Sequence, residues 1–275
     1  MIPCTFDYVR AGSAAEAISL VGQHGDEAKL LAGGHSLLPL MKLRLAQPSV
    51  LVDVGRLTEL RYIRESGDHV AIGALTRHTD LEHSPVLTQH APLLALAAAH
   101  VGDPQVRHRG TIGGSLAHAD PASDLPAATL ALGATYVAQG PHGTREIPAS
   151  EFFQGYLTTV LAADEMLIEI RVPTMQGAGF SFQKFTRRAQ DWGIVGVAAW
   201  VRGTQSGVAL FNMASTPVLA TDVSEALAGG ASAADAAQLA ATQAEPPNDL
   251  SASPEYRTHL AKVLTQRALL EAGAR

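Results

Sequence analysis

Two glycine pairs, Gly33-Gly34 and Gly113-Gly114, most constrain what this chain can fold into. The first lies in Ala32-Gly33-Gly34-His35-Ser36, and the second in Thr111-Ile112-Gly113-Gly114-Ser115. Glycine has no Cβ and tolerates positive φ, so such segments let a ligand approach the backbone and can present several N–H donors. A pyrophosphate makes this demand, and two segments that face each other can hold it from both sides. Either segment alone is more often an ordinary turn.

Neither segment fits the usual nucleotide-binding patterns. GxGxxG and GxxxxGK[ST] are absent at both places, and these patterns mark the Rossmann fingerprint and the P-loop. A nucleotide bound here therefore requires a different fold.

Composition excludes several functions. The net charge is −6 and aromatic residues make up only 5%, which argues against a nucleic-acid surface. One cysteine, Cys4, allows neither an internal disulfide nor the four thiolates of an iron–sulfur cluster. The chain has no uninterrupted run of 18 apolar residues and no signal-peptide pattern, so we expect a cytoplasmic protein without membrane insertion.

Strands and helices interleave irregularly, which favours an α+β fold over a doubly wound sheet. A capping box at Ser13–Glu16 predicts a helix that ends near Gly25. Buried or alternating strands are expected at residues 28–31, 50–54, 70–73, 130–137, 166–172, 180–185, 195–201 and 208–213, and helices at residues 92–100, 222–227, 233–241 and 254–272. We expect three parts, at residues 1–55, 56–173 and 174–275.

Five segments, in order along nearly the whole chain, resemble one known family. They are AGGHSLLPLMKLRLAQPSVLVDV (residues 32–54), GALTRHTDLEHSP (73–85), RHRGTIGGSLAHADPASDLPAA (107–128), DEMLIEIRVP (164–173) and SPEYRTHLAKVLTQRAL (253–269). Together they are similar to the FAD-binding medium subunits of molybdenum hydroxylases, of the carbon-monoxide dehydrogenase and xanthine dehydrogenase type. Five ordered matches are far more specific than either glycine pair alone.

The resemblance implies two small α+β lobes that clasp FAD (a PCMH-type fold), followed by an antiparallel sheet with helices. It also assigns the pyrophosphate contacts to Ala32, Gly33, Gly34, His35, Ser36, Thr111, Gly113, Gly114 and Ser115. Cys4 is distant in sequence from both segments, so we expect FAD to be bound non-covalently.

Two further residues are assigned near the sugar chain and the flavin ring, each with a plainer alternative. Asp124 follows the second segment and suits ribose or ribityl hydroxyls, because a carboxylate only accepts hydrogen bonds. It could equally be a helix N-cap. Lys184, with Arg188 behind it, stands where relatives carry a basic residue that contacts the flavin. Both could instead be solvated strand residues.

The remaining ring contacts are Trp192 and Leu167. Trp192 could cover one face of the flavin ring or be a core aromatic. Leu167 could touch the ring through its backbone, although a buried strand position is the stronger alternative. Gln190 replaces a glycine common in the family, which leaves the conformation of its loop open.

His78, His100 and His118 have no partnered nucleophile at a recognisable spacing, so they are interpreted as structural and no catalytic residue is assigned. The resemblance implies an electron-transfer subunit that joins an iron–sulfur small subunit and a molybdopterin large subunit, as a dimer of heterotrimers. Electrons would pass from the iron–sulfur clusters to FAD and on to an external acceptor. Two alternatives are a stand-alone FAD-dependent reductase of the same broad fold and a scaffold that has lost FAD.

Overall fold

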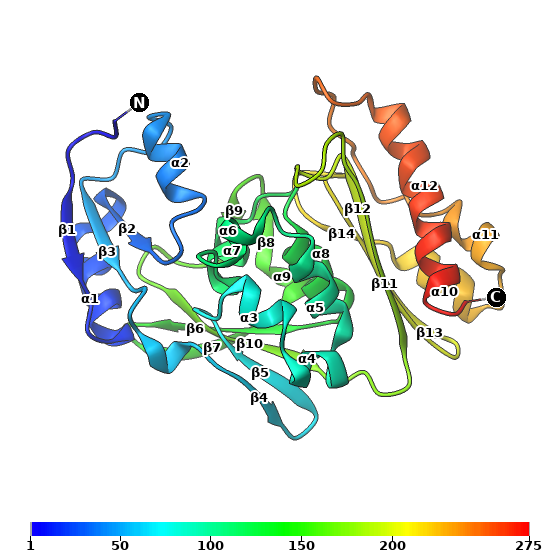
Figure 1. The fold of residues 1–275 in the computed structure, drawn as a ribbon, viewed down its shortest axis with the longest axis horizontal. Helices are drawn as coiled ribbons and strands as arrows, with labels where there is room; N and C mark the ends of the chain where they lie inside the picture. Colours follow the sequence, from blue (N-terminus) through cyan, green and yellow to red (C-terminus); the bar gives the residue numbers. More distant parts are fainter. Residues whose placement is uncertain (1, 275) are drawn as a thin grey trace.

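The computed structural model describes residues 2–274, which form three main sheets, one two-stranded sheet and the helices around them (Figure 1). The N-terminal sheet is parallel, in the order β1-β3-β2, and its α1 helix packs on β2 and β3. The elements of this first lobe are β1 (Asp7–Arg10), α1 (Ala14–His24), β2 (Ala28–Leu31), α2 (Leu37–Lys42) and β3 (Val50–Asp53).

The capping box expected for α1 forms only in part. Ser13 Oγ accepts from the Glu16 amide at 3.1 Å, as predicted. The Glu16 carboxylate reaches one residue further back, however, and accepts from Gly12 N at 2.7 Å rather than from Ser13. The helix ends at His24, and the C-cap Gly25 has a positive φ of 55°, which suits a residue without Cβ.

The second lobe is built on a five-stranded antiparallel sheet in the order β4-β5-β10-β6-β7. The apolar face of this sheet carries Val70, Ile72, Tyr136 and Ile170, which pack under the helices of the lobe. Its strands are β4 (Ile63–Ser66), β5 (His69–Gly73), β6 (Thr135–Gly140), β7 (Gly143–Pro148) and β10 (Met166–Pro173), with a small separate pair, β8 (Phe153–Gly155) and β9 (Thr158–Thr159). Its helices are α3 (His78–Glu82), α4 (Pro85–His90), α5 (Pro92–Ala99), α6 (Pro104–Arg107), α7 (Ile112–His118), α8 (Asp124–Ala131) and α9 (Ala149–Phe152).

A third, antiparallel sheet follows, in the order β11-β12-β13-β14. Helices α10 and α12 cover one face, while α5 and α8 of the second lobe cover the other. A strand covered on both faces needs apolar residues at nearly every position, and β12 is buried almost throughout. The elements are β11 (Gly179–Phe185), β12 (Val195–Arg202), β13 (Gln205–Phe211), β14 (Val218–Leu219), α10 (Thr221–Ala228), α11 (Ala233–Ala237) and α12 (Pro254–Glu271).

Two expected elements are wrong in their bounds. The strand expected at residues 130–137 begins only at Thr135, because Leu130 and Ala131 end α8 and Gly133 (φ 65°) turns the chain. The helix expected at residues 233–241 ends at Ala237. The three sheets lie within the three expected ranges of residues, and the division of the chain at those bounds stays a prediction.

Candidate functional site

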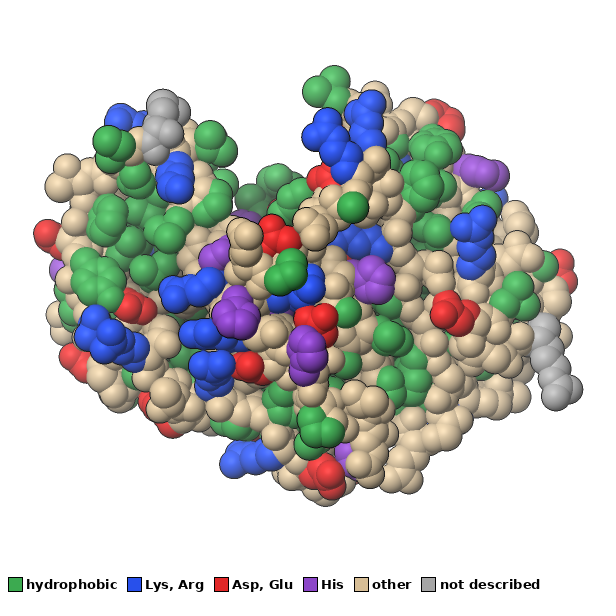
Figure 2. Space-filling model, in the orientation of Figure 1, with side chains coloured by type: hydrophobic (Ala, Val, Ile, Leu, Met, Phe, Trp, Pro, Cys, Tyr) green, Lys and Arg blue, Asp and Glu red, His purple; other side chains and the backbone are tan. Residues whose placement is uncertain are grey.

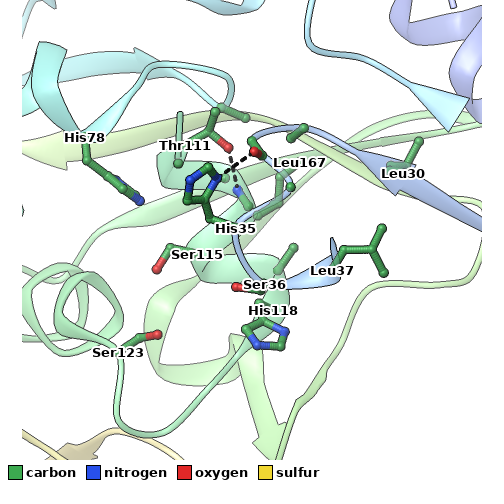
Figure 3. Close-up of a pocket in the computed structure, with 18 of the residues that line it drawn as sticks. Leu30, His35, Ser36, Leu37, His78, Thr111, Ser115, His118, Ser123 and Leu167 are labelled. Carbon is green, nitrogen blue, oxygen red and sulfur yellow. Dashed lines mark hydrogen bonds between the residues drawn. The ribbon is translucent and has the colours of Figure 1, made fainter. Parts of the chain in front are cut away.

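A cavity of about 700 Å³ lies where the first lobe, the second lobe and the third sheet meet. Figure 2 shows a hollow between the N-terminal lobe and the rest of the molecule, and Figure 3 shows side chains that line the cavity. All thirteen residues assigned from the sequence line this one cavity: Ala32, Gly33, Gly34, His35, Ser36, Thr111, Gly113, Gly114, Ser115, Asp124, Leu167, Lys184 and Trp192. Residues that are far apart in the chain are thus brought together at one site.

The first glycine segment joins β2 to α2 and offers unpaired backbone donors. Within residues 2–274, the amide N–H groups of Gly33, Gly34, His35 and Ser36 donate to no other protein atom. Gly34 has a φ of 75°, which the chain can adopt without strain because glycine has no Cβ. The His35 ring is fixed by a contact of 2.9 Å between its Nδ1 and Gly33 O. Successive free N–H groups of this kind form an anion-binding nest.

The second glycine segment differs from the predicted loop, because its glycines lie in the first turn of α7. Thr111 is the N-cap of this helix, and its Oγ1 accepts from Gly114 N at 3.2 Å. The amides of Ile112 and Gly113 donate to Thr76 O and Ala74 O, at 3.0 and 2.8 Å. The amides of residues 112–115 are therefore already used, and the hydroxyl groups of Thr111 and Ser115 remain to meet a ligand.

Gly33, Gly113 and Gly114 each leave space, where a Cβ would lie, for a different part of the molecule or for a ligand. A Cβ on Gly33 would lie 2.4 Å from Arg109 O, so this position lets the two lobes touch. A Cβ on Gly113 would lie 2.7 Å from Ala74 O, so this residue lets α7 pack against the end of β5. A Cβ on Gly114 would approach only Thr111 Oγ1, at 2.8 Å, and would otherwise extend into open space. Gly114 is the glycine of α7 whose open side lies at the cavity.

Asp124 and Lys184 form a buried ion pair at the cavity wall. Lys184 Nζ lies 2.9 Å from Asp124 Oδ1 and hydrogen-bonds to Oδ2 at 3.0 Å, and the two side chains are only 6% and 5% exposed. Lys184 also donates to His100 O at 2.9 Å. Burial raises the pKa of Asp124 to about 6, although the nearby Lys184 opposes that rise.

The structure excludes the alternative interpretations of Asp124, Lys184 and Trp192 that do not involve a ligand site. Asp124 is not an N-cap, because Ser123 holds that position and Asp124 lies in the first turn of α8. Lys184 is not a solvated strand residue, although Arg188 is exposed and does not line the cavity. Trp192 is not a core aromatic, since 57% of it is exposed beside the cavity.

Leu167, which was assigned to the site, and Gln190, which replaces a glycine of the family, both lie beside the cavity. Leu167 is buried in β10, next to a bulge in its pairing with β6, and it lines the cavity as well. Gln190 adopts a φ of 62°, which explains why a glycine suits this position.

Two histidines interpreted as structural also line the cavity, which the sequence did not indicate. His78 is buried, its Nδ1 has no hydrogen-bond partner within the described residues, and burial lowers its pKa to about 4. Burial likewise lowers the pKa of His118. Figure 3 shows His118 with Ser115 on α7, near Ser36 of the first segment. His100 instead packs against Phe182, with 5.2 Å between the ring centroids.

The fold and the cavity define a dinucleotide-cofactor protein, in which two α+β lobes enclose a nest of free amides and a glycine-bearing helix. Residues 4–175 match the family described as FAD binding domain in molybdopterin dehydrogenase, and residues 180–272 match the CO dehydrogenase flavoprotein C-terminal domain. The chain therefore belongs to the FAD-binding medium subunits of the molybdenum hydroxylases, of the carbon-monoxide dehydrogenase type, and its fold is the expected PCMH-type one.

The relatives and a solved structure match this chain along nearly its full length. The chain is 46% identical to the carbon monoxide dehydrogenase medium chain of Hydrogenophaga pseudoflava, covering 100% of this chain and 99% of the relative. It is 38% identical to the alpha subunit of the 6-hydroxypseudooxynicotine dehydrogenase complex of Paenarthrobacter nicotinovorans, covering 99% and 96%. A solved structure of carbon monoxide dehydrogenase from Hydrogenophaga pseudoflava matches with a TM-score of 0.96 at 45% identity, covering 99% and 98%. The family resemblance found in the sequence is confirmed, and the family is one of oxidoreductases.

No helix among the described residues is both long and apolar enough to span a membrane.

Proposed function

We propose that this chain holds one non-covalent FAD in the cavity and passes electrons from the iron–sulfur clusters of a partner subunit to an external acceptor. FAD would supply the redox chemistry, because it can take up electrons singly and release them in pairs. The observation that carries the proposal is the run of four free amides at residues 33–36, on the wall of a cavity lined by all thirteen assigned residues. A pyrophosphate would supply the acceptors that these amides lack.

Each part of the cavity would have its own task. The amides of Gly33 to Ser36, with the hydroxyl groups of Thr111 and Ser115, would bind the two phosphates. The Asp124 carboxylate would accept from ribose or ribityl hydroxyls, since its buried Oδ1 has no hydrogen-bond donor of good geometry in the described chain.

Around the flavin ring, the Lys184 ammonium would lie near the pyrimidine edge, where negative charge gathers on reduction. Trp192 would cover one face of the ring, and the backbone at Leu167 would border it. Cys4 does not line the cavity, which supports non-covalent binding.

The chain would act as the medium subunit of a larger enzyme. A small subunit would carry the iron–sulfur clusters and a large subunit the molybdopterin, in a cytoplasmic dimer of heterotrimers. The names of the relatives support this assembly, because they describe medium chains and complex subunits. These relatives also belong to enzymes named for different substrates, which supports placing substrate choice in another chain. Residues 1–55 and 56–173 would be the two FAD lobes, and residues 174–275 the C-terminal part.

The purified protein tests the proposal directly. We expect a flavin absorbance spectrum from the isolated chain, or its appearance after FAD is added and free FAD removed. In the complete complex, reducing substrate should bleach that spectrum, whereas the isolated chain with the same substrate should not respond. Substrate-dependent bleaching in the isolated chain would instead support a stand-alone reductase. A chain that stays colourless with excess FAD would contradict the proposal.

Gly114→Ala tests the contribution of α7. The new Cβ would displace the Thr111 hydroxyl from its capping position and extend toward the bound pyrophosphate. Loss of a cap costs about 1 kcal/mol, so we expect FAD binding to weaken about fivefold, measured by fluorescence titration. Gly229→Ala is the control, because a Cβ there meets only ordinary contacts at 3.4 Å or more, far from the cavity. Equal affinity in both variants would show that α7 does not border the phosphates.

A further inference from the structure

The segment that carries Trp192 is held at its far end by two side chains outside the cavity. This segment, here called the Trp192 loop, spans residues 186–194 between β11 and β12, and it is closed by a hydrogen bond of 2.8 Å from Ile194 N to Phe185 O. Gln190, Asp191 and Trp192 of the loop line the cavity. Apart from this closing bond, the strand pairing extends no further than Val195.

The two carbonyl groups that follow Trp192 are buried and need donors. Asn212, directly after β13, donates its Nδ2 to Gly193 O at 2.7 Å. Arg257 of α12 donates to Ile194 O. Among the described residues, these are the side-chain contacts made to the loop backbone from outside the loop.

The side chain of Arg257 is 0% exposed, and burying a charge in this way carries a large desolvation cost. Its guanidinium compensates by reaching three acceptors: the Ile194 carbonyl, the Asn212 carbonyl at 3.3 Å and the Asp249 carboxylate at 2.6 Å. A planar group with several donors can serve these directions at once, whereas lysine offers a single ammonium. Figure 1 shows α12 along the side of the third sheet that faces away from the second lobe.

Asn212 connects the loop with a second cavity wall. Its own amide donates to Pro121 O at 2.7 Å, in the short connection between α7 and α8 that also supplies Ser123 to the cavity and leads directly into Asp124 of α8. Asn212 has a φ of 59°, a conformation that asparagine tolerates better than most residues. Asn212 thus links the Trp192 loop to the α7–α8 connection through hydrogen bonds. Arg257 in turn donates to the Asn212 carbonyl.

We propose that Arg257 and Asn212 are positioning residues, which fix the Trp192 indole against the flavin ring from outside the cavity. This rests on the proposed function, because it requires FAD in the cavity. An indole in contact with a flavin quenches the flavin's fluorescence by electron transfer, so the emission per bound FAD reports the position of Trp192. A purely structural role for the two residues would change stability without changing that emission.

The main test compares FAD-loaded wild type, Asn212→Gly and Trp192→Phe. Glycine keeps the positive φ at position 212 while removing the donor to Gly193 O. At matched flavin occupancy, we expect Asn212→Gly to lose the quenching and approach the emission of Trp192→Phe. Emission at the wild-type level in Asn212→Gly would overturn the inference, as would Trp192→Phe emission equal to that of wild type. Absence of FAD from wild type would be a failure of the proposed function instead.

Two variants around Arg257 complete the test. Arg257→Lys keeps a charge but cannot reach all three acceptors, so its emission should lie between wild type and Asn212→Gly. Asp249→Asn is the matched control, because it weakens the contact of Arg257 on the side away from the Trp192 loop. We expect a lower unfolding temperature with unchanged emission per FAD. Emission in Asp249→Asn that rises as far as in Asn212→Gly would indicate general loosening and overturn the inference.

Discussion

Gly33→Ala is expected to weaken FAD binding about 100-fold, which corresponds to about 3 kcal/mol. The added Cβ would lie 2.4 Å from Arg109 O and 2.8 Å from Gly110 Cα. Both are backbone atoms of the second lobe, so no side-chain rotation can relieve the contact. The two lobes must separate, and the free amides of residues 33–36 then move away from Thr111 and Ser115.

Isothermal titration with FAD measures the loss, and Gly155→Ala provides a matched control. A Cβ on Gly155 meets no atom within 4 Å, and its backbone does not have a positive φ. That variant should bind FAD like the wild type. If Gly33→Ala also bound FAD with wild-type affinity, the contact between the lobes would not be needed for the cavity.

Local patterns in the sequence predicted the elements around the cavity well. The bounds of β2 agree with the expected strand at residues 28–31, because an apolar run ends there at two glycines. Strands β11 and β12 lie within a residue of the expected positions, since both are apolar and flanked by turn residues. The strand predicted at residues 130–137 was placed too early, because Leu130 and Ala131 suit a buried helix as well as a strand.

The sequence could not predict which donors are free. The two glycine segments have similar compositions, yet the amides of the first are unpaired while those of the second are bonded to Thr76, Ala74 and Thr111. That difference depends on what packs beside each segment, and residues 74–76, which follow β5, lie beside the start of α7. Glycine count and spacing carry no information about such a neighbour.

The sequence also could not predict which residues far apart in the chain form ion pairs. Asp124 and Lys184 were assigned separately, 60 residues apart, to the sugar chain and the flavin ring. The fold joins them because α8 and β11 both border the cavity. The assignment of each residue to the site needed only the family resemblance, whereas their mutual neutralisation needed the three-dimensional structure.

This ion pair leads to the second large expected effect. Lys184→Met removes the cation and leaves the Asp124 carboxylate buried without a counter-charge. Breaking a buried pair in this way costs about 3–5 kcal/mol. We expect that loss in the FAD-free protein near pH 8, measured as a fall in unfolding free energy relative to wild type.

The loss should depend on pH in a definite direction. Burial already raises the pKa of Asp124 from 3.8 to about 6, and Lys184 opposes that rise, so its removal raises the pKa further. A group whose pKa is higher in the folded state stabilises the fold when protonated, and that stability is lost as pH increases through the folded pKa. Lys184→Met should therefore be much closer to wild type at pH 5 than at pH 8.

A double variant distinguishes the effect of the unpaired charge on stability from the effect of the lost lysine packing. In Asp124→Asn/Lys184→Met no buried charge remains at this position, so most of the stability lost at pH 8 should return, and its difference from wild type should vary less with pH. A single variant equally destabilised at pH 5 and pH 8 would show that packing of the lysine stem, rather than an unpaired carboxylate, sets the cost.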